Sequence, residues 1–351
     1  MNGSGRLKLR RGVVASEDPL TVQVDGELRK AWADETLLGE MREGDEVVVN
    51  VAALDLDLGS GGFDVVHVNL TRGLSASGES REHVMKLNYT SLQHPVKPVE
   101  LPWRVMPPIE VKVPAEATKQ SMPVLVLPLH GHLAPASWAA AQASPGLKLG
   151  YVQTAGGALP GSLSHDVAQL RERGLLCGHI TAAPAYGGEH EALSVVGALD
   201  AAANGLGWDG ALVGPGPGII GSETRLGHGG MAALDSCHAA LALGLPTLLS
   251  PRLSEADPRD RHRGVSHHTL TVLELLLGRV EVAVPEGSAN IAAQLADVAG
   301  ERHQLHEARA NLAGYAAVGL PARTMGRGIE EDSLFFTAAL AAGARLGSAL
   351  A

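Results

Sequence analysis

The chain is poor in aromatic residues and in basic charge, and these shortages exclude one large class of proteins. Phe, Tyr and Trp make up 3% of its 351 residues, which removes the stacking platform used by most single-strand binders. The net charge is −10, and no long basic run occurs. The stripe of Lys and Arg that holds a phosphate backbone is therefore missing too. We expect no nucleic acid among the partners.

Cysteine and long apolar runs are also scarce, and this indicates a cytoplasmic protein. Cys177 and Cys237 are the two cysteines, and neither belongs to a CxxC motif. We therefore expect buried thiols in a reducing compartment rather than a disulfide framework. The charged residues 1–11 are not followed by the apolar stretch of a secretory signal. No run approaches the ~20 apolar residues of a membrane span, so we expect no membrane partner.

The 45% of hydrophobic residues suffice for a sizeable core. At roughly 150 residues per domain, the length of the chain predicts two domains. Residues 1–95 contain short β-branched runs separated by turn signals, which predict a small all-β barrel or sandwich. Prolines then indicate a linker or strap over residues 96–122. The β-branched runs are residues 12–15, 20–24, 46–51, 64–70 and 83–89.

Residues 123–351 show a different pattern, in which apolar runs alternate with helical periodicity. This alternation predicts an α/β, Rossmann-like domain with a mainly parallel sheet and helices on both faces. From residue 285 the pattern is helical, apart from a polar break at 325–332. The small apolar residues 335–346 should pack on the sheet or on a partner chain, which leaves a homo-oligomer open. The strand-like runs are 124–127, 149–152, 176–182, 211–213, 247–249 and 280–284, and the helical stretches between them are 134–143, 164–173, 191–203, 229–243 and 267–277.

Gly, His and charged residues gather in the loops that follow these strands, where α/β sheets bind their ligands. The longest such loop, residues 250–269, holds four arginines, three acids and three histidines. Its arginines can clamp a carboxylate or a phosphate. Alternatively, they form an ion-pair network with Glu255, Asp257 and Asp260 that holds the loop closed. The arginines are Arg252, Arg259, Arg261 and Arg263.

A glycine-rich segment after the fourth strand, Gly216-Pro-Gly-Ile-Ile-Gly221, matches the GxGxxG pattern of dinucleotide sites. The next helix, however, begins only near Gly229, and Arg252 stands where a ribose-binding acid would be. We therefore expect no dinucleotide, and interpret the segment as an anion-binding loop or a structural turn. The residues that would hold the anion are Gly216, Gly218, Gly221, Ser222, Thr224 and Arg225.

Two further motifs carry residues suited to chemistry. His130-Gly-His132 places two imidazoles on one side of an extended segment, a spacing that can bind a divalent transition metal. The alternative is one loop-bonded and one solvated histidine. Glu189 and His190 open a predicted helix, where a histidine beside acids can act as a general base. The alternative is that the acids merely suit the helix dipole.

His267 and His268 open the helix after the long loop, with Ser266 as the expected N-cap. Adjacent histidines point in different directions, so we expect at most one, His268, to face a ligand as an acid or base. Neither a nucleophile elbow nor a Walker loop occurs. If hydrolysis or group transfer takes place, metal assistance is therefore the expected route.

Four segments resemble an uncharacterised bacterial family, domain-of-unknown-function family 3866. They are residues 62–71, 85–92, 214–225 and 257–268. The last two are long enough to be specific, and the resemblance extends over nearly the whole chain. It implies a cytoplasmic bacterial protein and supplies no catalytic residue, substrate or cofactor.

The residues together predict a protein for a small anionic ligand, phosphorylated or carboxylated, at the carboxyl edge of the sheet. The loops 214–225 and 252–263 would hold the anion. Whether the protein is an enzyme stays open, because a non-catalytic sensor or an oligomeric scaffold would use the same loops.

Overall fold

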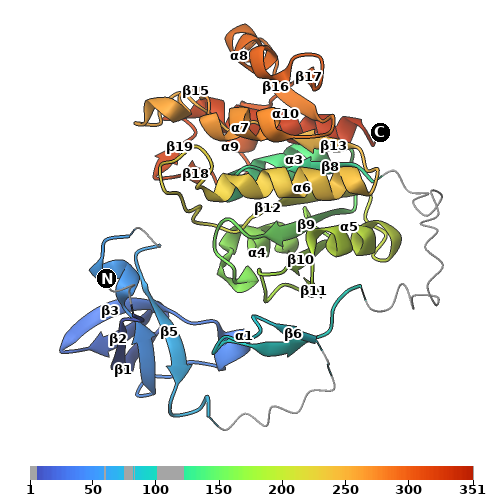
Figure 1. Ribbon diagram of the computed structural model, residues 1–351. Coiled ribbons are helices and arrows are strands. Elements are labelled where there is room, and N and C mark those ends of the chain that lie inside the picture. The colour runs from blue at the N-terminus through green and yellow to red at the C-terminus, as the bar shows by residue number, and fades with distance from the viewer. Residues whose placement is uncertain (1–5, 59–60, 75–81, 83, 101–121, 351) are drawn as a thin grey trace. The chain divides into compact units, whose positions relative to one another are not determined.

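The computed structural model describes residues 6–58, 61–74, 82, 84–100 and 122–350. Its contacts divide the chain into two compact units, Met1–Arg81 and Glu82–Ala351 (Figure 1). Most of the linker predicted at 96–122 lies outside the described residues. The mixed α/β class predicted from the sequence is confirmed.

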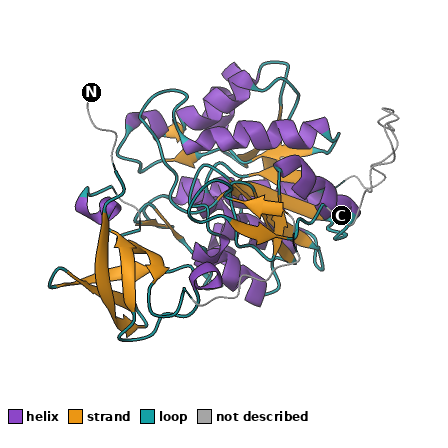
Figure 2. Cartoon of the chain, turned by 60° about the horizontal axis from the view of Figure 1, so that its bottom comes forward, coloured by secondary structure: helices purple, strands orange, loops and turns teal. Residues whose placement is uncertain are grey.

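The first unit is a closed five-stranded barrel with the strand order β1-β2-β3-β5-β4 (Figure 2). Alternate residues of its strands face inward, as in β4, where Val47 and Val49 are fully buried. The predicted small barrel is confirmed, although β3 carries too many polar residues to be recognised in the sequence. The elements are β1 (Leu9–Glu17), β2 (Leu20–Val24), β3 (Glu27–Trp32), α1 (Glu35–Leu38), β4 (Glu46–Asn50), α2 (Ala52–Asp55) and β5 (Asp64–Asn69).

The strand predicted at residues 83–89 does not join this barrel. It forms β6 (Val84–Lys86), which pairs with β7 (His94–Val96) in a separate hairpin of the larger unit. The reason is Lys86, whose buried ammonium donates to the carbonyl oxygens of Thr181 and Ala185, both at 2.7 Å. Assignment of this strand to the first domain was therefore wrong.

The larger unit is built on an eight-stranded, all-parallel sheet with the order β11-β10-β9-β12-β8-β13-β16-β17 (Figure 1). All six predicted strands are present, because each is a buried apolar run of the kind that parallel sheets require. The strands are β8 (Val124–Val126), β9 (Leu149–Thr154), β10 (Gly178–Ala182), β11 (His190–Ala192), β12 (Gly210–Pro215), β13 (Thr247–Leu249), β16 (Glu281–Pro285) and β17 (Gln304–Ala308).

Helices cover both faces of the sheet, and the central strand β8 divides its side chains between two cores. Val124 and Val126 pack in one core with α5, α6, α7 and α8. Leu125 and Leu127 pack in the other with α3, α4, α9 and α10. The helices are α3 (Leu133–Ala143), α4 (His165–Glu172), α5 (Val195–Asn204), α6 (Ala232–Ala242), α7 (His267–Leu275), α8 (Ala289–Ala299), α9 (Leu312–Ala316) and α10 (Ser333–Ser348).

Short 3-10 turns and two small hairpins complete this unit. The turns η1 (His130–His132) and η3 (Gly229–Met231) lead directly into α3 and α6. The others are η2 (Gly161–Leu163) and η4 (Asp260–His262), and the hairpins are β14 (Leu253–Ser254) with β15 (Gly264–Val265) and β18 (Arg323–Thr324) with β19 (Arg327–Gly328).

Three local predictions were wrong: the start of one helix, the wholly helical tail and the burial of Cys177. The segment expected to open a helix at Glu191 is the edge strand β11, because the Glu191 carboxylate accepts from buried Lys86 and from the Thr181 hydroxyl. The helix α5 begins only after Ser194, which caps it. The tail predicted as helical contains β17 as well as α8, α9 and α10. Cys237 is buried as expected, but Cys177 is exposed.

Helix α10 packs in one core with α3 and with side chains of the sheet. The apolar residues 335–346 therefore pack within their own chain, on the sheet, which is one of the two predicted alternatives. The contact depends on Gly343, where an added Cβ would lie 2.2 Å from the Ala136 carbonyl oxygen. Replacing Gly343 with alanine should therefore destabilise the unit by about 1–3 kcal/mol, as overpacking does. Urea unfolding measures this, and Ser348→Ala on the exposed side of α10 should change stability by less than about 0.5 kcal/mol.

Equal stabilities of the two variants would show that α3 and α10 accommodate an added methyl group at Gly343 without cost, and would contradict this close contact.

Candidate functional site

The polar loops of the larger unit meet at the carboxyl edge of its sheet, where β12, β8 and β13 are neighbours. After β8 the chain passes to α3 on one face, whereas after β12 it passes to α6 on the other. Such a divergence marks the place at which α/β proteins bind ligands. The loops are in contact, since Nδ1 of His132 after β8 lies 2.8 Å from the hydroxyl of Ser250 after β13.

Arg252 is the central side chain of this edge and is only 1% exposed. Its Nη1 donates to Nδ1 of His268 at 3.1 Å, and its Nη2 lies 3.4 Å from a carboxylate oxygen of Asp257. Burial lowers the pKa of the guanidinium to about 10. Its Nε–H is buried and has no hydrogen-bond partner among the described residues, which is a costly arrangement for a charged donor.

Asp257, which is fully buried, is the centre of an ion-pair network. Arg259 binds it with two prongs, Nε and Nη2, each at 2.9 Å. Arg327 lies 3.6 Å from Asp257 and donates to Asp332 at 3.0 Å. Burial opposes ionisation of Asp257, but the hydrogen bonds from Arg259 outweigh it and hold the pKa below its usual range. Three guanidinium groups thus share two carboxylates, and Arg252 has no carboxylate of its own within this network.

Four histidine rings lie beside Arg252. His228 and His268 are stacked, with ring centroids 3.6 Å apart and planes within 2°. His267 contacts both rings edge-on, at centroid distances of 5.4 Å and 4.5 Å. His262 lies 4.9 Å from His267 and from His268. Burial, followed by the charge of Arg252, lowers the pKa of His268 to about 2 and that of His262 to about 3, so the rings are neutral at physiological pH.

Glycines allow these loops to approach one another. A Cβ at Gly230 would lie 2.8 Å from Nδ1 of His268 and 3.0 Å from Nδ1 of His228. A Cβ at Gly229 would lie 1.9 Å from the carbonyl oxygen of Gly156, in the loop after β9. The stacked histidines therefore rest against backbone at a position that only glycine leaves open.

The predicted metal pair, His130 and His132, does not converge. The segment is the 3-10 turn η1 rather than an extended strand, so the two rings turn away from each other. Nε2 of His130 lies 2.8 Å from the Ser164 hydroxyl. His132 is fully buried, and its ring packs edge-on against Phe335 at 4.5 Å. The prediction of an extended two-histidine chelate was wrong in its geometry.

The glycine-rich segment 216–221 does not form a phosphate cradle at a helix start. A Cβ at Gly216 would lie 2.3 Å from the Ala158 carbonyl oxygen, whereas Gly218 is a turn residue with φ 73°. Beyond Gly221 the chain forms an exposed hairpin closed by a bridge to His228. Its polar side chains bond within the hairpin or to α7: Ser222 with Thr224 at 3.0 Å, and Arg225 with Glu274.

The arginines predicted as an anion clamp have separate roles. Arg259 belongs to the buried network, Arg263 donates to the backbone of its own loop at 2.9 Å, and Arg261 pairs with Glu223 at 3.5 Å. Arg252 alone among the four is fully buried beside the histidines. The loop-holding network and the candidate anion group therefore exist together, on different arginines.

Glu189 and His190, predicted as catalytic, lie at the edge of the sheet rather than with Arg252. His190 begins β11, which is separated from β8 by β10, β9 and β12. Glu189 accepts from Nε of Arg171 at 2.7 Å. His268 lies beside Arg252, and the ring of His267 contacts that of His268; that at most one of the two faces a ligand stays a prediction. Sequence reasoning missed His228 and Arg327, which stand apart from the dense motifs.

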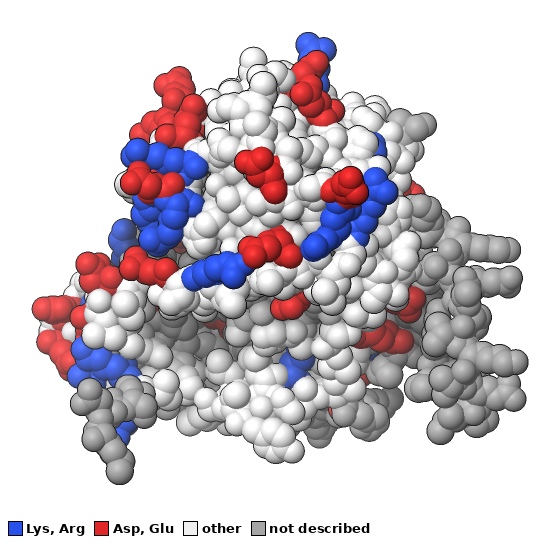
Figure 3. Space-filling view, turned by 45° about the horizontal axis from the view of Figure 1, so that its top comes forward, with Lys and Arg blue, Asp and Glu red and all other residues white. Residues whose placement is uncertain are grey.

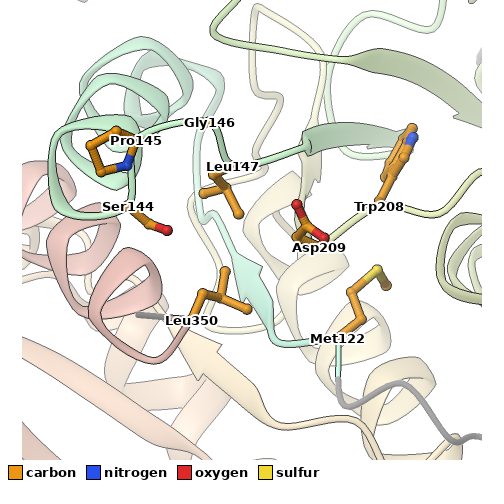
Figure 4. Close-up of a pocket in the computed structure, with 8 residues that line it drawn as sticks. All are labelled: Met122, Ser144, Pro145, Gly146, Leu147, Trp208, Asp209 and Leu350. Carbon is orange, nitrogen blue, oxygen red and sulfur yellow. The ribbon is translucent and has the colours of Figure 1, made fainter.

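A pocket of about 380 Å³ lies at the opposite, amino edge of the sheet (Figure 4). It is open to solvent, and apolar side chains such as Leu147, Trp208 and Leu350 line it with Asp209. It holds none of the buried polar groups described above, so it is a separate feature.

The fold and the site define an α/β protein with a parallel sheet whose polar groups gather at the carboxyl ends of the strands. The chain belongs to the family described as "protein of unknown function (DUF3866)", whose sequence model matches residues 30–343. Neither a curated protein nor a solved structure matches the chain. Within the described residues, no helix combines the length and the apolar character needed to cross a membrane.

Proposed function

We propose that the larger unit binds a small carboxylated or phosphorylated ligand at the carboxyl edge of its sheet, with Arg252 receiving the anionic group. The observation that carries this proposal is the buried Nε–H of Arg252, which lacks a hydrogen-bond partner in the described part of the chain. A buried guanidinium gains most when such a donor meets an oxygen anion.

The charge balance supports the proposal. Arg252, Arg259 and Arg327 face Asp257 and Asp332, which leaves one positive charge in excess around two buried carboxylates. Neutral histidines surround Arg252 and do not offset this charge. An anion would neutralise the excess, and carboxylate and phosphate both fit the planar donor fork of arginine.

The surroundings also favour a small ligand over a polymer. On the face shown in Figure 3, acidic and basic side chains are interspersed around a broad uncharged surface, with no continuous basic stripe on that face. Neutral ring nitrogens next to Arg252 are suitable proton acceptors or hydrogen-bond partners for a bound ligand. They favour a binding protein or an enzyme equally, and turnover of the ligand would decide between the two.

The test is a thermal-shift screen with inorganic phosphate, simple dicarboxylates and phosphorylated sugars as probes. A probe at about 100 times its Kd should stabilise the wild-type protein by about 2.7 kcal/mol, or roughly 5–10 °C in Tm. Arg252→Met should abolish this shift, because it removes the charge and keeps much of the side-chain volume.

Arg261→Ala is the matched control, since this arginine lies in the same loop but is exposed and pairs with exposed Glu223. It should keep the full shift. If the wild-type protein responds to no anion, or if Arg252→Met and Arg261→Ala respond alike, Arg252 is not an anion-binding group.

A further inference from the structure

We propose that His228, His267 and His268 form a binding site for one divalent transition-metal ion, such as Zn²⁺. One ring nitrogen from each of the three residues lies within 4.8 Å of the others. This site differs from the His130–His132 pair that the sequence suggests, and its existence does not depend on the anion site at Arg252.

The first argument is the state of two ring nitrogens. Nδ1 of His228 and Nε2 of His267 are both buried, and neither has a hydrogen-bond partner among the described residues. A buried ring nitrogen without a partner is unfavourable, and a metal ion held between the two rings would satisfy both. Neutral imidazole is also the form of histidine that binds metals.

The second argument is the hydrogen bond on the far side of His228. Its Nε2 lies 3.0 Å from the carbonyl oxygen of Arg225, so Nε2–H must be the donor. This fixes the tautomer in which Nδ1 carries the free lone pair. Metal-binding histidines almost always donate their second ring N–H in this way, which orients the ring and raises its basicity.

The third argument is the distance between rings. Two imidazoles that share a tetrahedral zinc ion, with Zn–N distances of about 2.0–2.1 Å, have ring centroids about 5 Å apart. The His228–His267 distance is 5.4 Å with planes at 78°, and the His267–His268 distance is 4.5 Å with planes at 76°. Both pairs are therefore close to the spacing of shared ligands.

His268 is the ligand that has to adjust. Its ring is stacked on His228 at 3.6 Å, and its Nδ1 accepts from Nη1 of Arg252. Coordination requires this ring to rotate out of the stack. Arg252 competes for the same side chain, so its removal should favour the metal rather than weaken it.

His267 and His268, the first two residues of α7, would thus bind the same metal ion. Ser266 caps α7 by accepting from the backbone N–H of His268 at 3.2 Å, which fixes the two histidines at the first turn. Gly230 leaves the room in which the rings of His228 and His268 come together. The site combines a hairpin from β12 with a helix start after β13, two segments about forty residues apart in the sequence.

The experiment uses the full-length chain without an affinity tag, stripped with a chelator and dialysed against Zn²⁺ or Co²⁺. We expect one ion per chain by elemental analysis, and a visible absorption band of Co²⁺ in a tetrahedral nitrogen environment. His228→Ala and His267→Ala each remove a ligand and should weaken binding by at least the roughly 10–100-fold that loss of an outer-shell partner costs. His165→Ala, which removes an exposed histidine at the start of α4, should leave binding unchanged.

Circular dichroism and Tm confirm that each variant is folded, and X-ray absorption of the zinc-loaded wild-type protein gives an answer that needs no variant. Imidazole nitrogens in its first coordination shell support the site, whereas an oxygen-only shell or less than one ion per chain overturns it. Loss of the ion in His130→Ala, with binding retained in His228→Ala, would overturn it too. Arg252→Met separates the two proposals, because it should abolish the response to anions and keep the metal.

Discussion

Replacing Asp257 with asparagine should lower the free energy of unfolding of the larger unit by about 3–5 kcal/mol, the usual cost of breaking a buried ion pair. Asp257 is fully buried, and its carboxylate is the shared partner of Arg252, Arg259 and Arg327. Arg259 is 43% exposed in its side chain and can turn to water. Arg252 cannot do so, since it is 1% exposed, and its charge would remain buried.

Urea unfolding followed by circular dichroism measures this loss. Asp260→Asn is the matched control, because Asp260 lies in the same loop, is 94% exposed in its side chain and pairs only loosely with Arg263 at 3.4 Å. It should change stability by less than about 0.5 kcal/mol. In Asp257→Asn combined with Arg252→Met, a good part of the stability should return, since the unpaired charge is gone. Equal effects of the two single aspartate variants would contradict the network.

The second large effect is a loss of stability in mild acid. Burial, followed by the charge of Arg252, lowers the pKa of His132 to about 3, and burial, followed by His130, lowers that of His179 to about 3. The unfolded chain protonates both rings near pH 6.5, whereas the folded protein keeps them neutral. The unfolded state thus binds more protons below pH 6.5, and stability falls as the pH drops from about 6.5 toward 3.

The contribution of these two histidines follows from their pKa values, and His262 and His268, whose pKa values are lowered in the same direction, add to it. At pH 5 His132 and His179 should each cost about 2 kcal/mol relative to pH 7.5. Together they remove about 4 kcal/mol of the 5–15 kcal/mol that holds a typical domain folded, as order-of-magnitude values. Urea midpoints at pH 7.5, 6 and 5 provide the measurement.

His179→Asn provides a check on the cause. Nε2 of His179 donates to the Gln153 side chain at 3.2 Å, and asparagine keeps a donor without a titrating group. The variant should lose stability at pH 7.5 but show a shallower decline toward pH 5. A wild-type protein that is as stable at pH 5 as at pH 7.5 would show that these rings are not held neutral.

The fold was predictable where the burial of a strand or helix is reflected in the pattern of apolar residues in its sequence. Central strands such as Val124–Val126 are buried on both faces and appear as unbroken apolar runs. The edge strands His190–Ala192 and Gln304–Ala308 face solvent on one side and consist largely of polar residues. Their strand conformation depends on neighbours in the sheet and on side-chain contacts such as Lys86 with Glu191, which no local pattern reveals.

The candidate site was predictable in its place but not in its membership. The polar loops do lie at the carboxyl edge, because parallel strands all end there. Arg252 and Arg261 look alike in the sequence, yet one is buried beside histidines and the other is exposed. His130 and His132 seemed paired because an extended chain alternates its side chains, and a 3-10 turn does not.

The place of β12 in the sheet has a consequence for synthesis on the ribosome. β8 is the first strand of the sheet to be made, yet its two neighbours, β12 and β13, are the fifth and sixth strands of the sheet in chain order. The apolar residues of β8 therefore emerge long before Gly210–Pro215 can pair with them. Non-local pairing of this kind slows folding and exposes strand edges on the way. Nascent chains that end before Gly210 should hold β8 unpaired and depend on chaperones.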